Sequence, residues 1–311
     1  MNYSKVEKDI KSLRWKRMEK VIVIVGPTAV GKTKLSIELA KKLDGEIINA
    51  DSTQVYKNLD IATAKITNDE KEGIIHHLFD IKNIDEDYTV YDYQRDCRLK
   101  IKEILAKNKT PIMVGGTGLY IKASLYDYNF SKEDIHESFD ELSNDELYAK
   151  LLSIDPKSEI HKNNRKRVVR AINYFLNNNK PISDNNKTDK LLYDCIFIGL
   201  TTDREKLYNL INKRTDKMID MGLIDEAKKI YDTGIRPKAV MTPIGYKELF
   251  EYFDNKISLD EAISLIKQRS RRYAKRQYTW FRNQMNVNWF NVNFEDFDKT
   301  IEEVSEFIKK Q

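Results

Sequence analysis

Residues 26–33, with the sequence GPTAVGKT, match the phosphate-binding pattern G-x-x-x-x-G-K-[ST]. They follow the apolar run 21–25 and precede a helical pattern, which is the strand, loop and helix order that the motif needs. Backbone N–H groups at the mouth of such a helix bind phosphate oxygens. The alternative, an ordinary strand-turn-helix connection, leaves the Lys32-Thr33 pair unexplained. We therefore expect a phosphorylated ligand on Gly26, Pro27, Thr28, Ala29, Val30, Gly31, Lys32 and Thr33.

Two side chains of this loop have specific roles in the prediction. Lys32 is expected to reach the terminal phosphates of the ligand, and the hydroxyl of Thr33 is expected to hold Mg²⁺.

A carboxylate is predicted at the same edge of the sheet. A short strand over residues 46–50 delivers Asp51 at its C-terminal end, where ligands lie in a parallel α/β sheet. An aspartate in that place can act as the general base for a nucleophile brought to the phosphorylated ligand. It can equally be the N-cap of a helix, with Ser52 as its neighbour. The residue types leave both roles open.

The phosphate loop alone does not select a class of enzyme. A GTPase would need a D-x-x-G motif, and no glycine of the sequence has an aspartate three positions before it. Residues 186–189 match the guanine-reading pattern N-K-x-D, but they follow a low-complexity stretch and not an apolar strand, so we interpret the match as a coincidence. An ATPase would have a magnesium-binding aspartate at the end of an apolar strand, whereas the run 111–114 ends in Gly115 and Gly116.

Strand-like runs alternate with helical patterns along the chain, which predicts an α/β fold. We expect a doubly wound, mostly parallel sheet of the type found in P-loop NTPases. The apolar runs 21–25, 111–114 and 195–200 and the short segment 46–50 are the expected strands, and 34–43, 91–107, 119–125, 207–221 and 259–284 are the expected helices.

The composition changes along the chain and divides it into parts. Residues 126–190 contain no strand-like run and end in an asparagine-rich stretch, so we expect a helical insertion domain there. Residues 18–125 and 191–311 form the expected P-loop core with C-terminal helices. Residues 1–17 carry no motif and are expected to be either a disordered basic tail or the result of an upstream start codon in the gene.

The overall composition is that of a globular protein without a membrane span. Of the 311 residues 33% are charged and 41% apolar, and no apolar run approaches the length of about 20 residues that a membrane span requires. The two cysteines, Cys97 and Cys195, provide neither a metal pair nor a disulfide framework, which favours a reducing, cytoplasmic location. The net charge of +5 is modest, but its clustering suggests a polyanionic partner.

Eight blocks of the sequence resemble, in the same order, those of the tRNA dimethylallyltransferase (isopentenyl-tRNA transferase) family. The match runs from about residue 21 to 289. The blocks are GPTAVGKT (26–33), DSTQVYK (51–57), DIATAK (60–65), HHLFDI (76–81), GGTGLYI (115–121), HKNNRKRVVRA (161–171), IGYKE (244–248) and KRQYTWFR (275–282). The DSTQVYK, GGTG and KRQ-TW blocks are specific to the family, whereas many families share the phosphate loop.

The resemblance implies transfer of a five-carbon prenyl group from dimethylallyl diphosphate to N6 of an adenosine in tRNA. That adenosine, at position 37, lies immediately 3′ of the anticodon in tRNAs that read codons beginning with U. Catalysis would fall to Asp51 as the general base, to Lys32, Thr33 with Mg²⁺, and Arg214 at the diphosphate, and to Thr28 as a substrate contact. Outside the resemblance, we would interpret Arg214 as a solvated helix charge beside Lys213 and Asp216.

The resemblance also implies a binding surface for the tRNA anticodon stem-loop, on a monomeric enzyme. Cations that bind phosphates and aromatic rings that stack on unpaired bases suit such a partner. The expected contacts are Asp51, Ser52, Thr53, Gln54, Thr117, Asn163, Asn164, Arg165, Lys166, Arg167, Lys275, Arg276, Gln277, Tyr278, Thr279, Trp280, Phe281 and Arg282. For each cation or aromatic residue, the alternative is a solvated charge or a ring packed inward.

Three features depart from the family pattern. The insertion between residues 128 and 155 is shorter than usual, which puts its RNA contacts in question but not the chemistry. Thr53 replaces a more common methionine, and the sequence has no Cys/His zinc-finger tail, so it resembles the bacterial form.

Two other functions remain open. One is a prenyltransferase for free adenine nucleotide, which would not need the basic C-terminal helix. The other is a nucleic-acid-binding module with a structural phosphate loop, against which Lys32, Thr33 and Asp51 argue.

Overall fold

The computed structural model describes residues 20–128, 130, 135–184 and 190–311. The chain divides into two compact units, one made of residues up to Leu125 together with Leu191–Gln311, the other of Tyr126–Lys190. The division falls at the residues where the composition of the sequence changes. The predictions made for residues 1–17 and 186–189 lie outside the described residues.

The larger unit is built on a six-stranded sheet in which every neighbouring pair of strands is parallel, as predicted. The strand order is β3-β2-β4-β1-β5-β6. The strands are β1 (Lys20–Val25), β2 (Gly45–Asn49), β3 (His76–His77), β4 (Thr110–Val114), β5 (Asp194–Thr201) and β6 (Asn288–Asn291). Both edge strands were missed in the sequence, because β3 has two residues and β6 (NWFN) lacks an apolar run.

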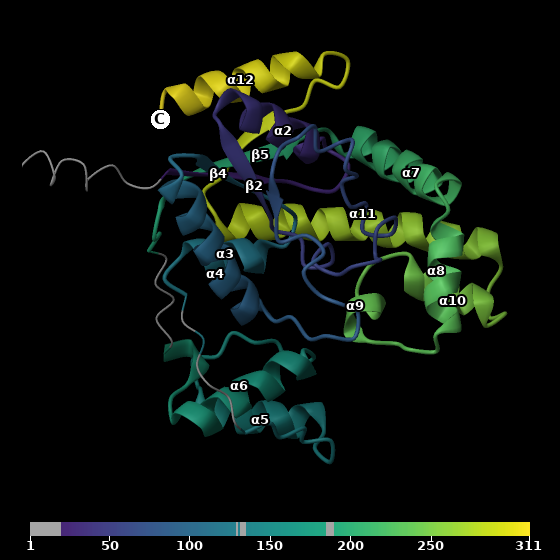
Figure 1. The fold of residues 1–311 in the computed structure, drawn as a ribbon. Coiled ribbons are helices and arrows are strands. Elements are labelled where there is room, and N and C mark those ends of the chain that lie inside the picture. Colours follow the sequence, from purple (N-terminus) through teal and green to yellow (C-terminus); the bar gives the residue numbers. More distant parts are fainter. Residues whose placement is uncertain (1–19, 129, 131–134, 185–189) are drawn as a thin grey trace, which may run out of the picture. The chain divides into compact units, whose positions relative to one another are not determined.

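Helices cover both faces of this sheet, which explains why its central strands are apolar without alternation. In Figure 1, α2 and α12 lie together on one side of the strands and α3 and α4 on the other. The helices are α2 (Lys32–Lys42), α3 (Val90–Ala106), α4 (Gly118–Leu125), α7 (Arg204–Asp220), α8 (Leu223–Asp232), α9 (Lys238–Met241), α10 (Tyr246–Phe253), α11 (Leu259–Gln284) and α12 (Phe297–Lys309). No helix of the described chain is long and apolar enough to cross a membrane.

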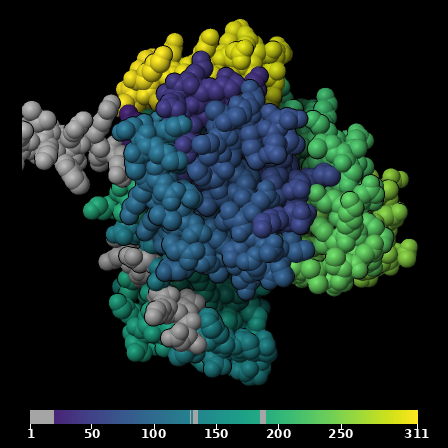
Figure 2. Space-filling view, viewed as in Figure 1, coloured from purple at the N-terminus to yellow at the C-terminus, as the bar shows by residue number. Residues whose placement is uncertain are grey.

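The main hydrophobic core lies between the sheet and the helices α2, α7 and α12. Ile22 of β1 is in register with Ile112 of β4 and with Ile196 of β5, so these side chains point to one face. On the other face, the hydroxyl of Tyr93 in α3 donates a hydrogen bond to the carbonyl of Asn49 at the end of β2, at 2.7 Å. The residues that follow β2, coloured blue, spread over the visible face of this unit in the space-filling view (Figure 2).

The smaller unit is helical, with α5 (Asn144–Ile154), α6 (Arg165–Asn178) and a 3₁₀ turn at Ile182–Asp184. It has a core of its own, made by Leu147 and Leu151 of α5 and by Val168, Ala171 and Ile172 of α6. The buried Asp155 accepts hydrogen bonds from the backbone and hydroxyl of Ser183, which ties the 3₁₀ turn to the end of α5.

Replacing a core residue of the long helix α11 tests this packing. Phe281 is fully buried, so Phe281→Ala is expected to lower the free energy of unfolding by about 3–5 kcal/mol, because the ring no longer packs in the core and a cavity remains. Asn283→Ala, at an exposed position of the same helix, should change it by less than about 0.5 kcal/mol. Chemical denaturation of both variants measures the difference, and similar stabilities would show that the helix does not pack as described.

Candidate active site

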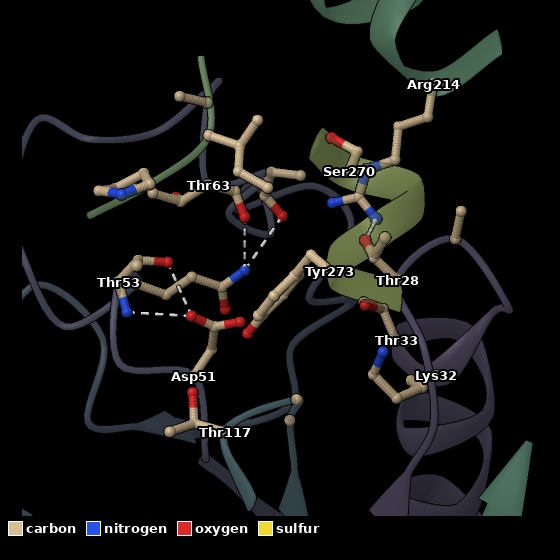
Figure 3. A pocket seen from close by; sticks show the side chains of 18 of the residues that line it. Thr28, Lys32, Thr33, Asp51, Thr53, Thr63, Thr117, Arg214, Ser270 and Tyr273 are labelled. Atoms are coloured by element: carbon tan, nitrogen blue, oxygen red, sulfur yellow. Dashed lines mark hydrogen bonds between the residues drawn. The ribbon is translucent and has the colours of Figure 1, made fainter. Parts of the chain in front are cut away.

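One cavity of about 600 Å³ in the larger unit contains most of the residues predicted to act on the phosphorylated ligand. Its walls are the phosphate loop after β1, the turn after β2, an irregular segment at residues 62–66, the end of β4, and the helices α7 and α11. The segments that follow β1, β2 and β4 reach it from the carboxyl ends of these strands, which is the expected place for a ligand. Figure 3 shows this cavity from close by.

The phosphate loop and α7 bring two cations to one side of the cavity. Arg214 of α7 donates a hydrogen bond to the hydroxyl of Thr28 at 2.8 Å, across 186 residues of sequence. The ammonium group of Lys32 donates to the carbonyls of Gly26 and Pro27, at 3.1 and 2.7 Å. Arg214 is therefore not a solvated helix charge, and Asp216 pairs with Lys267 instead.

Neither cation has a carboxylate partner within ion-pair distance among the described residues. Burial and the guanidinium of Arg214 lower the pKa of Lys32 to about 7, and the charge of Asp51 opposes that shift. Burial also lowers the pKa of Arg214, against the effect of Asp51 and Glu70. Burial and the repulsion between the two positive charges are both unfavourable, and an anion bound between the cations would relieve them. The arrangement supports the predicted phosphate site.

Asp51 lies across the cavity from these cations, and its carboxylate is partly engaged. Its Oδ1 accepts hydrogen bonds from the backbone N–H and the hydroxyl of Thr53, at 3.0 and 2.7 Å. The other oxygen is directed to the side of Tyr273 in Figure 3. In the described chain from Asp51 to Thr89 no helix begins, so the alternative role as a helix N-cap is wrong. Asp51 closes a local turn and still presents an oxygen to the cavity.

The long helix α11 ties the phosphate loop to the turn after β4. The buried side chain of Gln277 accepts a hydrogen bond from the N–H of Thr28 at 3.1 Å and donates one to the carbonyl of Gly116 at 3.2 Å. The helix can approach this closely only because the turn is made of glycines. A Cβ at Gly116 would lie 2.0 Å from Gln277, and one at Gly118 would lie 2.1 Å from the ring of Trp280. The GGTG and KRQ-TW blocks are therefore in direct contact.

Thr117 of the same turn links the ends of β2 and β4. Its hydroxyl accepts a hydrogen bond from the N–H of Ser52 at 3.0 Å, and it also bonds the Ser52 hydroxyl at 3.3 Å. Gln54, two residues after Ser52, donates to the carbonyls of Thr63 and Ala64. The predicted substrate contacts 51–54 and Thr117 are thus brought together in one wall of the cavity.

The aromatic residues of α11 are mostly packed inward, which corrects part of the prediction. Phe281 is fully buried in the core and therefore cannot stack on a base. The hydroxyl of Tyr278 bonds Thr201 of β5, and its ring packs against Trp289. The ring of Trp280 packs on Gly118.

Four cations of α11 are exposed. They follow one stripe of the helix with Thr279, at positions three or four residues apart, and are Arg272, Lys275, Arg276 and Arg282. Arg269, by contrast, is paired with the buried carboxylate of Glu248 at 2.5 Å. Lys275, Arg276, Thr279 and Arg282 remain available to a polyanionic partner.

In the smaller unit, Arg165 was expected to contact RNA but is used within the fold. Its guanidinium donates to the carbonyls of Phe139 and Leu142, at 2.5 and 2.8 Å, because these carbonyls precede α5 and have no helical partner. Asn164 is the N-cap of α6. Asn163, Lys166 and Arg167 are exposed.

Tyr273 and Ser270 line the cavity, and neither was among the predicted site residues. Burial raises the pKa of Tyr273, with the charge of Asp51 as the second cause. The signal was available in the sequence, because 270, 273 and 277 lie three and four residues apart on one face of a helix. The predicted contacts of this helix were taken from the block 275–282, and both residues precede that block.

The family model described as IPP transferase matches residues 54–284. The chain belongs to this family. It is 52% identical to the tRNA dimethylallyltransferase of Anoxybacillus flavithermus over 94% of its own length and 96% of that protein, and 51% identical to that of Geobacillus kaustophilus over 93% and 96%. Two sequence blocks that carry the resemblance to this family, GGTG and KRQ-TW, are therefore in contact in the folded chain.

Solved structures of the family have the same architecture. The tRNA isopentenylpyrophosphate transferase of Bacillus halodurans is 45% identical, with a TM-score of 0.73, over 94% of this chain and 96% of that one. A eukaryotic dimethylallyltransferase, described as acting on tRNA, is 30% identical with a TM-score of 0.83, over 94% and 80%.

Replacing Asp51 by asparagine distinguishes its structural role, in which it closes the local turn, from its expected role as a general base. Asp51→Asn keeps the oxygen that accepts from Thr53 but removes the charge, so the turn should persist while turnover falls by about 10²–10⁴, the usual cost of a missing general base. Affinity for a diphosphate ligand should not weaken, since a like charge is removed. Single-turnover rates and ligand binding on one preparation measure both, with Asp298→Asn on α12 as the control. Turnover within about threefold of the unchanged protein would contradict the role.

Proposed function

We propose that this chain is a tRNA dimethylallyltransferase. It transfers the dimethylallyl group of dimethylallyl diphosphate to N6 of adenosine 37, immediately 3′ of the anticodon, in tRNAs that read codons beginning with U. The observation that carries the proposal is one cavity with two cations at the phosphate loop on one side, neither in an ion pair with a described carboxylate, and the carboxylate of Asp51 on the other. The names of the relatives support the same activity.

The cationic side of the cavity suits the leaving group. As the bond between the prenyl carbon and oxygen breaks, negative charge builds up on diphosphate. Lys32 and Arg214 would neutralise that charge. Neither is in an ion pair with a described carboxylate, so no such pair has to break first. Thr28, bonded to Arg214, is placed to contact the same group.

The carboxylate side suits the nucleophile. An exocyclic amine of adenine is a weak nucleophile, and its attack forms the N–C bond while one N–H proton must leave. Asp51 is placed to take that proton, and diphosphate departs with the electron pair of the broken C–O bond. Because the two ends of the cavity hold opposite charges, donor and acceptor would meet between them.

Magnesium fits the residues at the loop. Thr33 supplies a hydroxyl oxygen, and no group of three or more His, Cys, Asp or Glu side chains that could hold a metal is present among the described residues. Mg²⁺ is commonly held by few protein oxygens together with waters and phosphate oxygens, which agrees with a single threonine. When bound, it would add positive charge at the diphosphate.

The exposed stripe on α11 favours RNA over free adenine nucleotide as the acceptor. Lys275, Arg276 and Arg282 lie on this stripe. Of these three, only Arg276 lines the cavity, so a free nucleotide bound there would leave the other two without a role. A cationic stripe beside the cavity suits the backbone of an anticodon stem-loop, whose target base must leave its stack. We further propose that the enzyme works as a monomer in the cytoplasm, where the unpaired Cys97 and Cys195 would remain reduced.

The donor and acceptor can be tested in one experiment. Labelled dimethylallyl diphosphate is incubated with the protein, unmodified tRNA and AMP as a competing acceptor. We expect label to appear in tRNA and not in AMP, and to disappear when EDTA removes Mg²⁺. Labelled AMP would favour the free-nucleotide enzyme. Rapid hydrolysis of ATP without tRNA would contradict the proposed donor.

The salt dependence of tRNA binding tests the stripe. Lys275→Ala with Arg276→Ala should weaken binding and reduce the slope of log affinity against log salt by about 0.7–0.9 for each phosphate that the variant no longer neutralises. Turnover at saturating tRNA should change much less. Lys309→Ala with Lys310→Ala, at the end of α12, removes the same charge elsewhere and should leave the slope unchanged. Equal slopes for both double variants would show that the stripe does not face RNA.

A further inference from the structure

One wall of the cavity is irregular chain. Thr53 and Gln54 line it from the turn after β2, and Ala62, Thr63 and Ala64 line it from further along the same segment. No helix or strand in the described residues 50–75 holds this wall in place. Its position must therefore come from contacts with other elements.

One such contact is made by Glu226, which belongs to α8 and does not line the cavity. Its carboxylate accepts hydrogen bonds from three consecutive backbone N–H groups, those of Asp60, Ile61 and Ala62, at 3.1, 2.8 and 3.1 Å. A fourth comes from the hydroxyl of Tyr246 at 2.7 Å. Three successive N–H groups form a concave anion site, and here a side chain of the same protein fills it.

We propose that Glu226 is a positioning residue for substrate recognition, acting through Gln54. The segment that it holds continues directly into Thr63 and Ala64. The carbonyls of these two residues accept hydrogen bonds from the amide nitrogen of Gln54, at 2.9 and 3.3 Å. With the nitrogen so engaged, the orientation of the Gln54 amide in the cavity depends on where Glu226 holds the segment. The inference rests on the proposed function, in which Gln54 contacts tRNA.

The same contacts explain two sequence blocks to which the proposed chemistry gives no part, DIATAK (60–65) and IGYKE (244–248). The first supplies the three N–H groups, and the second supplies Tyr246. Tyr246 is fully buried, and burial, with the adjacent Glu226, raises its pKa, so its hydroxyl stays a donor. Glu248 accepts from the N–H of Gly245 at 2.8 Å and pairs with Arg269 of α11, which anchors the start of α10.

Lys65 provides a second set of contacts, here called the Lys65 brace, that holds residues 56–80 independently of Glu226. Because this brace remains in a Glu226 variant, we expect the cavity wall to loosen only near residues 60–62. The ammonium group of Lys65 donates to the carbonyl of Tyr56 and to the carboxylates of Asp60 and Asp80, at 2.8, 2.6 and 2.6 Å. The Lys65 side chain is only 5% exposed, whereas Asp60 and Asp80 are exposed, so the hydrogen bond to the carbonyl of Tyr56 is the most shielded contact of this brace. The phosphate loop is held separately, by Gln277 and Arg214.

Glu226→Gln tests the proposal with little change of shape. An amide has one acceptor oxygen, and its NH₂ group would face N–H donors, so part of the cluster loses its acceptor. We expect the KM for tRNA to rise about tenfold, as for loss of hydrogen bonds to a charged group, while the KM for dimethylallyl diphosphate stays within about twofold. Asp225→Asn, at an exposed position in the first turn of the same helix, is the matched control and should behave as the unchanged protein.

A double-mutant cycle shows whether Glu226 acts through Gln54. Gln54→Ala should itself raise the KM for tRNA, and adding Glu226→Gln to it should raise that KM by less than about twofold more, since coupled residues are not additive. Tyr246→Phe removes one of the four donors and keeps the ring in the core. It should shift the KM for tRNA in the same direction by about threefold, and it serves where Glu226→Gln folds poorly.

Hydrogen exchange of the ligand-free protein keeps the two hypotheses apart. Amides in residues 59–66 should exchange faster in Glu226→Gln than in Asp225→Asn. If the unchanged protein transfers nothing to tRNA, the proposed function fails, and faster exchange still supports the contact. Unchanged exchange, an unchanged KM for tRNA, a parallel rise in both KM values, or full additivity with Gln54→Ala would each overturn the positioning role.

Discussion

The site depends on two cations that are held together without a carboxylate partner within ion-pair distance in the described structure. Lys32 and Arg214 come from segments far apart in sequence, and each costs free energy when its charge is buried. That cost is offset when an anion enters. The docking of α7 over the phosphate loop, through the hydrogen bond from Arg214 to Thr28, therefore makes an anion-binding site where the loop alone would make a weaker one.

Helix α11 connects the side of the cavity that holds these cations to the side that holds Asp51. Gln277 contacts the phosphate loop and the turn after β4, while Tyr273, one turn earlier, lies beside Asp51. The exposed stripe that includes Lys275 and Arg276 lies on the same helix. One rigid element thus contacts the phosphate loop, lies beside the carboxylate of Asp51 and carries the exposed cations, which keeps their spacing constant. The opposite wall, residues 51–66, has no regular structure, so its backbone groups need partners outside it, and distant side chains such as Glu226 supply them.

Much of the architecture and chemistry could be predicted from the sequence. The four central strands follow from apolar runs, the span of α11 was predicted as residues 259–284, and the phosphate loop follows from its glycines and the Lys32-Thr33 pair. These features are local, since a buried strand, an amphipathic helix and a glycine loop each show their physical requirements in consecutive residues. The short strands β3 and β6 were missed because a two-residue or polar strand has no such pattern.

Other features were decided by the tertiary structure alone. Sequence left Asp51 between a helix cap and a base, and only the absence of a helix between Asp51 and Thr89, all described, removed the first. It did not show that Phe281 is buried, that Arg165 is used inside its unit, or that Glu226 holds the cavity wall. Whether a charged or aromatic side chain faces solvent, a partner or the core depends on neighbours that are distant in sequence. A local sequence pattern does not identify those neighbours.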